Sequence, residues 1–500
     1  MDGVYQKELY PLRYVPLNRA AVLLVGHGSL LDPNSSRPVH DLRSHLCGRF
    51  DEVRTAFWKE EPQLHYAFDL IERPEVFVVP VFTSEGYFTK RVVPRELGLY
   101  GRLTRRGSRT IHYCDPIGSH PRMFEIVSER AEEAVPISAR PDTSVVILGH
   151  GTDRHTRSDS TTLRLVDQLQ GDNRYARVLP AFLDQEPTLR RVLEAERVGP
   201  MVVVPFFISE GWHVGTTIPG DLTPGGSAQD LEGSPLWFAK PVGTHPVLAE
   251  VVVEMVEHHS SNAPGGESRG PVASPDPNLA PEPAPLSAVR AKRAFLSWIR
   301  SAAPRPRVFL QTIARFGDEA RFEIRHEEDR DADPTALRSL ESLEQLREVV
   351  IRTATGQCRP LKTAPTLQSG WRLGDLNEDE LWEAYALLYP AAPVHWYLER
   401  EGEFASVPFR EAASRQTGLY AGAAGLEQNR VDALVRGCCS TDRCLREPSW
   451  AIPGEQTSGS PRRMPGRVPC RAPCAVLFSE ASREVALDGG GSLDPTLGSR

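Results

Sequence analysis

Ala20–Ser29 reads AAVLLVGHGS, and Ser144–Thr152 repeats this pattern as SVVILGHGT. Two further pairs of segments follow in the same order: VVPVFTSEG at 78–86 with VVPFFISEG at 203–211, and DPIGSHP at 115–121 with KPVGTHP at 240–246. His27 and His150 are 123 positions apart, and the histidines of the last pair are 125 apart. Three matched segments at one period indicate an internal duplication, with a first copy over residues 20–135 and a second over 140–260.

Each copy has the pattern of an α/β fold. Short runs of Val, Ile and Leu end in glycine-rich turns, and longer helix-like stretches lie between them. Continuous apolar strands favour parallel sheets covered on both faces. We expect helices at 39–58, 122–134, 160–170, 188–196 and 246–258. Because ligands of open α/β sheets bind at the carboxyl ends of the strands, the GHG and SEG segments are placed where a site would lie.

The rest of the chain differs in composition. Residues 261–286 are rich in Pro, Ser, Gly and Ala, which predicts a flexible linker. For 287–395 we expect a smaller, supporting α+β domain, with a helix at 289–301, a strand-like stretch at 307–325, a second helix at 335–353 and a capping box formed by Asn377 and Glu380. A cysteine-rich metal-cluster domain is expected over 396–485, and a disordered tail over 486–500.

Composition excludes some classes of protein. The 500 residues carry a formal net charge of -8 and 40% hydrophobic residues, so nothing indicates a nucleic-acid partner. The apolar runs are much shorter than a membrane span, and the first 16 residues lack the apolar stretch of a secretory signal. We therefore expect a cytoplasmic protein without a membrane partner. The sequence does not predict its oligomeric state.

Five of the eight cysteines lie between residues 438 and 474. Cys438 and Cys444 are separated by five residues, Cys470 and Cys474 by three, and Cys439 is an alternative to Cys438. In a reducing compartment such a group favours metal binding over disulfides. Thiolates bind iron–sulfur clusters and zinc strongly. An iron–sulfur cluster is the preferred interpretation, with a zinc site or no metal as alternatives.

Histidines at the strand ends suggest metal chemistry. His150 follows one strand, and His213 follows another within SEGWH. A neutral imidazole binds divalent cobalt, iron, nickel or zinc and also accepts protons near neutral pH. Insertion of a metal into a tetrapyrrole needs both functions, and Glu85 and Glu210 could add an oxygen ligand or a proton acceptor. The alternative is that such a histidine is only a hydrogen-bonded turn residue, beside glycines that permit the turn.

The two copies are unequal. Gly211-Trp212-His213 in the second copy corresponds to Gly86-Tyr87-Phe88 in the first, which therefore lacks the second imidazole. A single active centre dominated by the second copy follows, and His27 either faces it or is a relic. His120 and His245 precede prolines at helix starts, so we expect a structural role for them.

Together, the motifs VGHGS, P-x-F-x-x-x-G-x-H and G-x-H-P make residues 20–260 resemble a tandem CbiX-type sirohydrochlorin cobaltochelatase of the class II chelatase superfamily. The resemblance implies two flavodoxin-like halves facing across a cleft, a macrocycle bound between them and metal insertion without ATP. It also implies that His150 and His213 are the metal ligands. From the chemistry of the residues we expect both to act in catalysis together with Glu210. The absence of a GxxxxGK[ST] loop from the sequence agrees with this.

The substrate of such a family carries many carboxylates, which basic side chains would pair with. The residues expected to contact substrate are His27, Glu85, Lys90, Arg91 and Arg154, with His155 and Arg157 as further candidates. Most of 290–480 resembles the C-terminal 4Fe-4S domain appended to some CbiX-like proteins, which implies a cluster and a redox partner.

Cobalt insertion for cobalamin synthesis is thus the leading hypothesis. Iron insertion for sirohaem, a non-catalytic tetrapyrrole or metal carrier, and an iron–sulfur electron-transfer protein are the alternatives.

Overall fold

In the computed structural model the chain forms two compact units, residues 1–26, 34–55 and 73–276, and residues 27–33, 56–72 and 277–500. The structure describes residues 17–29, 35–60, 62–151, 159–195, 199–209, 229–231, 234–261, 287–301, 307–308, 311–316, 321–349, 368–388, 394, 397–398, 401, 406–416, 418–439, 465–468 and 473–488. Among these residues, no helix is both long enough and apolar enough to cross a membrane.

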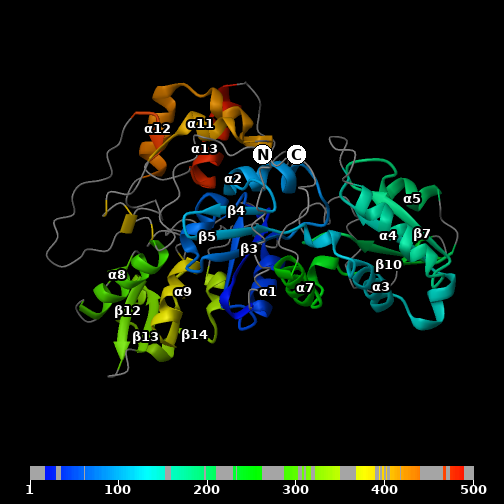
Figure 1. Ribbon diagram of the computed structural model, residues 1–500, viewed down its shortest axis with the longest axis horizontal. Coiled ribbons are helices and arrows are strands. Elements are labelled where there is room, and N and C mark those ends of the chain that lie inside the picture. Colours follow the sequence, from blue (N-terminus) through cyan, green and yellow to red (C-terminus); the bar gives the residue numbers. More distant parts are fainter. Residues whose placement is uncertain are drawn as a thin grey trace, which may run out of the picture. The chain divides into compact units, whose positions relative to one another are not determined.

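Each copy forms its own five-stranded sheet (Figure 1). The strand order is β2-β1-β3-β5-β4 in the first copy and β7-β6-β8-β10-β9 in the second, so the two sheets have the same topology. The inner strands pair in parallel. The duplicated α/β fold is therefore confirmed, with one antiparallel edge strand in each copy, β4 or β9, that we did not predict. The strands are β1 (Ala21–Gly26), β2 (Glu52–Phe57), β3 (Glu75–Pro80), β4 (Leu103–Arg106), β5 (Arg109–Tyr113), β6 (Ser144–Gly149), β7 (Arg177–Phe182), β8 (Met201–Pro205), β9 (Gln229–Leu231) and β10 (Ser234–Phe238).

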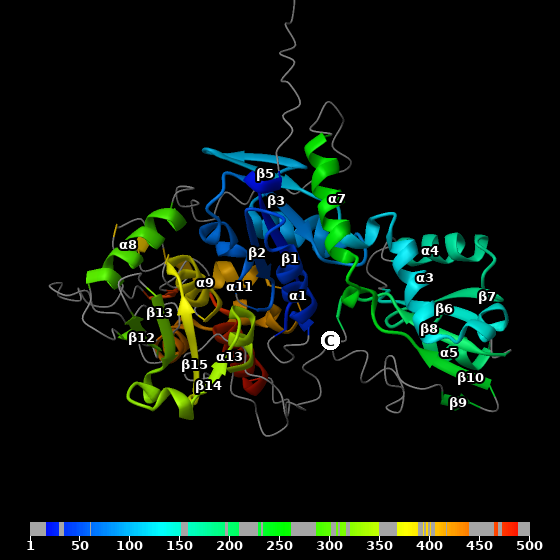
Figure 2. The same cartoon turned by 90° about the horizontal axis from the view of Figure 1, so that it is seen from below.

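The last helix of each copy packs against the other copy. The helix α3 (Met123–Ala134) contacts β8 and α4 (Ser160–Gly171) of the second copy, and α7 (Leu248–Ser261) contacts α1 (Arg37–Leu46) of the first. Figure 2 shows both helix pairs side by side. The helix α5 (Leu189–Ala195) contacts β7 within its own copy. The last helix in the sequence of each copy therefore packs in the other copy, so the two copies exchange one helix.

The helix predicted over 39–58 is wrong after Leu46. The helix α1 ends there, Gly48 takes a left-handed φ of 84°, and Glu52–Phe57 forms β2 instead. Glycine at this position commonly ends a helix because it adopts positive φ without steric cost. The β-branched Val53 and Thr55 then favour a strand. The other four predicted helices of the duplicated region match α3, α4, α5 and α7 within three residues at each end.

The supporting region contains one mixed sheet, in the order β11-β12-β13-β15-β14. Its strands are β11 (Arg307–Val308), β12 (Gln311–Phe316), β13 (Arg321–His326), β14 (Arg338–Leu340) and β15 (Trp371–Leu376). The strand-like stretch expected over 307–325 consists of three antiparallel strands. The helix expected over 335–353 is also wrong. In its described part, Arg338–Leu340 pairs in parallel with β15 and Leu343–Val349 is a 3-10 helix, so strand pairing overrides the helical spacing of the leucines.

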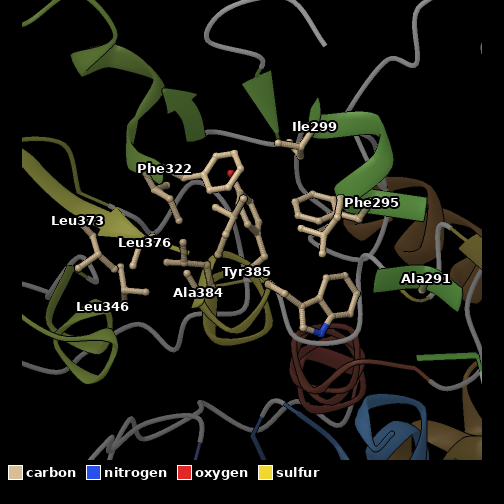
Figure 3. Close-up of a cluster of buried hydrophobic side chains, with 14 of the residues drawn as sticks. Ala291, Phe295, Ile299, Phe322, Leu346, Leu373, Leu376, Ala384 and Tyr385 are labelled. Atoms are coloured by element: carbon tan, nitrogen blue, oxygen red, sulfur yellow. The ribbon is translucent and has the colours of Figure 1, made fainter. Parts of the chain in front are cut away.

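The helices α8 (Ser287–Ser301) and α9 (Glu378–Leu388) share one apolar core with this sheet (Figure 3). The Phe295 ring lies 5.4 Å from Tyr385 and 5.7 Å from Trp382, centroid to centroid. The predicted capping box is confirmed, since the backbone N–H groups of Asn377 and Glu380 each donate to the other residue's side chain, at 2.8 and 2.9 Å.

The cysteine-rich region has a small apolar core of its own, formed mainly by helices. It contains α11 (Phe409–Ser414), α12 (Gln428–Cys438), α13 (Ala475–Asp488) and the short antiparallel pair β16 (Val407–Pro408) and β17 (Arg467–Val468). The first three residues of the tail predicted over 486–500 belong to α13, and the rest lie outside the described residues. Most of the predicted linker, residues 262–286, lies outside the described residues.

Candidate functional site

His150 lies directly after β6, where its carbonyl oxygen accepts the backbone N–H groups of Leu183 and Asp184 at 3.2 and 3.0 Å. These two residues follow β7, so the turn joins the carboxyl ends of two neighbouring strands. The imidazole Nδ1 is 3.3 Å from Asp184 Oδ2, and both side chains are more than half exposed. A carboxylate can only accept, so a hydrogen bond along this contact would come from Nδ1–H and would leave Nε2 as the nitrogen able to bind a metal.

The glycines on either side of His150 are required by packing as well as by the turn. A Cβ on Gly149 would lie 2.5 Å from Thr162 Oγ1. Gly151 has φ +67°, and a Cβ there would lie 2.6 Å from Gln185 Cγ. Side chains at these positions would push the turn away from the end of β7. The G-H-G sequence therefore reflects tight packing of this turn against the side chains of Thr162 and Gln185.

The first copy repeats this turn with different side chains. The His27 carbonyl accepts the N–H groups of Trp58 and Lys59 at 3.1 and 2.8 Å, and Gly28 has φ +67°. Lys59 therefore occupies the position of Asp184. The His27 ring turns back on its own loop, because its Nδ1 donates to the Gly28 carbonyl at 2.9 Å. The His150–Asp184 pair of the second copy has no counterpart at this position.

The SEG loop of the first copy also lacks metal-binding character. Phe88 begins a π-helical turn (Phe88–Val92), and its ring packs 5.2 Å from the ring of Phe82. Glu85 and Lys90, both proposed substrate contacts, form an ion pair with each other, while Arg91 is exposed. The charge of this loop is thus partly internally compensated.

Several predicted residues cannot be placed. His213, Glu210, Arg154, His155 and Arg157 lie outside the described residues. Among the residues that are described, no three His, Cys, Asp or Glu side chains come together as a metal site. His150 with Asp184 is therefore the part of the predicted site whose geometry can be examined.

The structural role predicted for His120 and His245 is confirmed. Each Nδ1 accepts a backbone N–H two residues later, from Arg122 at 3.3 Å or from Val247 at 3.4 Å. Each Nε2 faces a glutamate of the other copy, Glu254 at 3.6 Å or Glu129 at 3.0 Å.

A shift by the repeat period of 125 positions converts the His120–Glu254 pair into the His245–Glu129 pair. The two copies are therefore joined by a pseudo-twofold contact. Burial lowers the pKa of both histidines, an effect that the facing glutamates partly offset.

Two of the proposed cluster ligands are described, and their chemistry fits an iron–sulfur cluster. Cys438 ends α12 and Cys474 immediately precedes α13, and both are partly exposed at the edge of one apolar core. Cys474 Sγ accepts the Leu477 backbone N–H at 3.4 Å, a contact that favours a thiolate ligand. Cys439 is instead only 6% exposed within that core. Cys444 and Cys470 lie outside the described residues.

Sequence reasoning missed Asp184 and Lys59. The signal was present, because the two residues are 125 positions apart, which is the period of the repeat. It was not recognised because neither residue stands in a repeated motif. Only the pairing of β6 with β7 places Asp184 beside His150.

Comparisons with known proteins agree with the geometry. The family model described as CbiX matches residues 21–134 and 144–259. The models described as DR2241 stabilising domain and 4Fe-4S iron-sulfur cluster binding domain match residues 307–400 and 401–483.

Two curated relatives carry chelatase names. A probable sirohydrochlorin cobaltochelatase of Halobacterium salinarum is 34% identical over 278 residues, which cover 50% of this chain and 94% of the relative. A sirohydrochlorin cobaltochelatase of Methanopyrus kandleri is 32% identical over 139 residues, which cover 23% of this chain and 96% of the relative.

One solved structure is similar over nearly the whole chain. The crystal structure of DR2241 from Deinococcus radiodurans has a TM-score of 0.71 at 26% identity, covering 94% of this chain and 100% of that one. That protein is described as multi-domain, with structural similarity to chelatases and two additional novel domains.

Proposed function

Because the chain belongs to the CbiX family of class II chelatases, we propose that it inserts a divalent metal ion into sirohydrochlorin without ATP. The metal and the tetrapyrrole are both substrates of this reaction. Insertion requires a site that holds the ion weakly, releases it to the macrocycle and takes up two pyrrole protons.

The observation that carries the proposal is the pair formed by His150 and Asp184. The 3.3 Å contact at Nδ1 would orient the ring and leave Nε2 for an incoming ion. His213 would supply a second imidazole, as its place in the SEGWH motif indicates. Two neutral nitrogen ligands leave coordination positions open, which suits transfer to another ligand better than a closed four-ligand site does. Glu210 and the imidazoles, once the metal has left them, would accept the pyrrole protons.

Cobalt is the metal that we propose, with cobalamin synthesis as the destination. The names of the two curated relatives support this. Imidazole ligands alone do not separate cobalt from iron strongly, so sirohaem synthesis is the outcome that a metal comparison has to test.

We further propose that Cys438, Cys444, Cys470 and Cys474 hold a 4Fe-4S cluster. A cluster of this kind supplies one-electron redox chemistry when bound. The family model over 401–483 supports its presence. The partial exposure of Cys438, against the burial of Cys439, supports the choice between these neighbours.

The test is anaerobic incubation of the full chain with sirohydrochlorin and Co²⁺, Fe²⁺ or Ni²⁺, followed by absorption spectroscopy. We expect acceleration over the uncatalysed rate, fastest with Co²⁺, and its loss in the His150→Ala/His213→Ala variant. The matched control is His27→Ala, the equivalent histidine of the first copy, which should leave metal affinity unchanged. A protein that binds both substrates without acceleration would be a carrier, and normal activity of the double variant would refute the site.

A further inference from the structure

The two strand-end turns have the same backbone. In each, a histidine carbonyl accepts two successive N–H groups from the end of the neighbouring strand, at 3.1 and 2.8 Å in the first copy and 3.2 and 3.0 Å in the second. The loop that follows β2 or β7 is closed by the same backbone hydrogen bond in both copies. The Phe57 N–H donates to the Pro62 carbonyl at 2.8 Å, and the Phe182 N–H donates to the Pro187 carbonyl at 2.9 Å. These bonds fix the correspondence of side chains independently of the sequence motifs.

The residues that correspond in the two turns carry opposite charges beside the histidine. Asp184 stands beside His150 in the second copy, where the proposed function has it support the ligand of a cation. Lys59 takes that backbone position in the first copy, which also has Phe88 where the second has His213. A lysine at this point opposes metal binding and favours an anion.

We propose that Lys59 binds a carboxylate of the tetrapyrrole substrate. The inference rests on the proposed function and adds to it a substrate-binding residue. Its ligand is defined by chemistry: the carboxylate-bearing side chains that surround the macrocycle.

The surroundings of Lys59 suit such a contact. Its Nζ lies 5.3 Å from the centroid of the Trp58 ring, and Trp58 itself is buried. Burial lowers the pKa of Lys59 to about 8. The ammonium is therefore charged in most molecules at neutral pH, although it is poorly hydrated. A poorly hydrated ammonium gains more from an anion than one in bulk water, because the local dielectric constant is lower.

The neighbouring residue Glu60 has a contact within the turn. Glu60 is 8% exposed, and its Oε2 accepts the backbone N–H of Ser29 at 3.4 Å. Glu60 thereby ties the turn after β1 to the loop after β2. We infer that it positions the turn, while Lys59 provides the charge.

The test is titration of metal-free sirohydrochlorin into the full chain, with the Kd read from the change in its absorption or fluorescence. Lys59→Met should weaken binding about tenfold, as expected for loss of one charge-assisted contact, and Lys59→Arg should restore most of it. The matched control is Lys240→Met, an exposed lysine of the second copy, which should bind like the wild type. With the methyl ester of sirohydrochlorin, the wild type and Lys59→Met should bind equally.

The outcomes separate the two hypotheses. If the wild type inserts metal and Lys59→Met binds as tightly as the wild type, the inference is refuted and the proposed function stands. A penalty that persists undiminished with the ester also refutes it, because the lysine then acts on something other than a carboxylate. If the wild type neither binds nor metallates sirohydrochlorin, the proposed function fails, and the inference fails with it. Urea unfolding of each variant identifies any loss that is due to folding.

Discussion

Replacing Asp184 with asparagine should distinguish an effect on the orientation of His150 from an effect on the stability of the fold. The two side chains are 53% and 56% exposed, and an exposed ion pair contributes only about 0.2–1 kcal/mol to stability. The stability of Asp184→Asn should therefore stay within about 1 kcal/mol of the wild type. Metal handling should suffer more, since loss of a residue that orients a metal-binding histidine costs about 10–100-fold in affinity or activity. The exposure of this pair places the expected loss near tenfold, or about 1.4 kcal/mol.

The assay is the initial rate of sirohydrochlorin metallation as a function of Co²⁺ concentration. We expect the loss in kcat/KM for the metal, with the KM for sirohydrochlorin unchanged, because Asp184 acts on the ligand of the ion. Asp172→Asn is the matched control: Asp172 pairs with Arg174 on the exposed surface of the same copy. A rate for Asp184→Asn within twofold of the wild type, or an equal loss in Asp172→Asn, would refute the assigned role.

Three further predictions concern the turn, the contact between the copies and the cluster. Gly151→Ala should lose about 2 kcal/mol of stability, seen in urea unfolding, because an L-residue is strained at φ +67° and its Cβ would lie 2.6 Å from a neighbouring side chain; unchanged stability would contradict the geometry of the turn. Burial lowers the pKa of His120 and His245 in the folded state, so the unfolded chain binds more protons below pH 6.5. Their contribution to stability should be complete above pH 6.5 and decline as pH falls through the lowered pKa, and a double His→Gln variant should show a flatter pH profile in thermal unfolding. Cys438→Ser should abolish the visible absorbance of an anaerobically purified cluster while Cys439→Ser retains it, and the reverse result would exchange the two assignments.

The duplication made much of the fold predictable from sequence. Buried parallel strands such as Ser144–Gly149 are continuous apolar runs, and two copies of the same run give independent evidence for one strand. The predictions failed where a helix-like pattern is interrupted by one residue or by pairing. Gly48 ends α1, and Leu340 lies in a strand because β15 pairs with it. Neither effect is visible in the periodicity of apolar residues.

The candidate site was predictable only where a motif carried it. His150 is marked by flanking glycines that the tight packing of the turn requires. The position of Asp184 depends on which strand lies beside β6, which is a property of sheet order rather than of local sequence. Lys59 shows the same limit, because its meaning comes only from comparison with the residue 125 positions later.

The two copies also show which differences folding can explain. The turns after β1 and β6 need a glycine with φ +67° and the same pair of backbone hydrogen bonds, and both copies retain them. The side chains at 59 and 184 leave the turn from a backbone whose hydrogen bonds are the same in the two copies, so the turn itself does not dictate the charge at this position. The proposed binding of a carboxylate by Lys59 would explain the change from aspartate to lysine. It would also agree with Phe88 in place of His213, which removes an imidazole from the first copy.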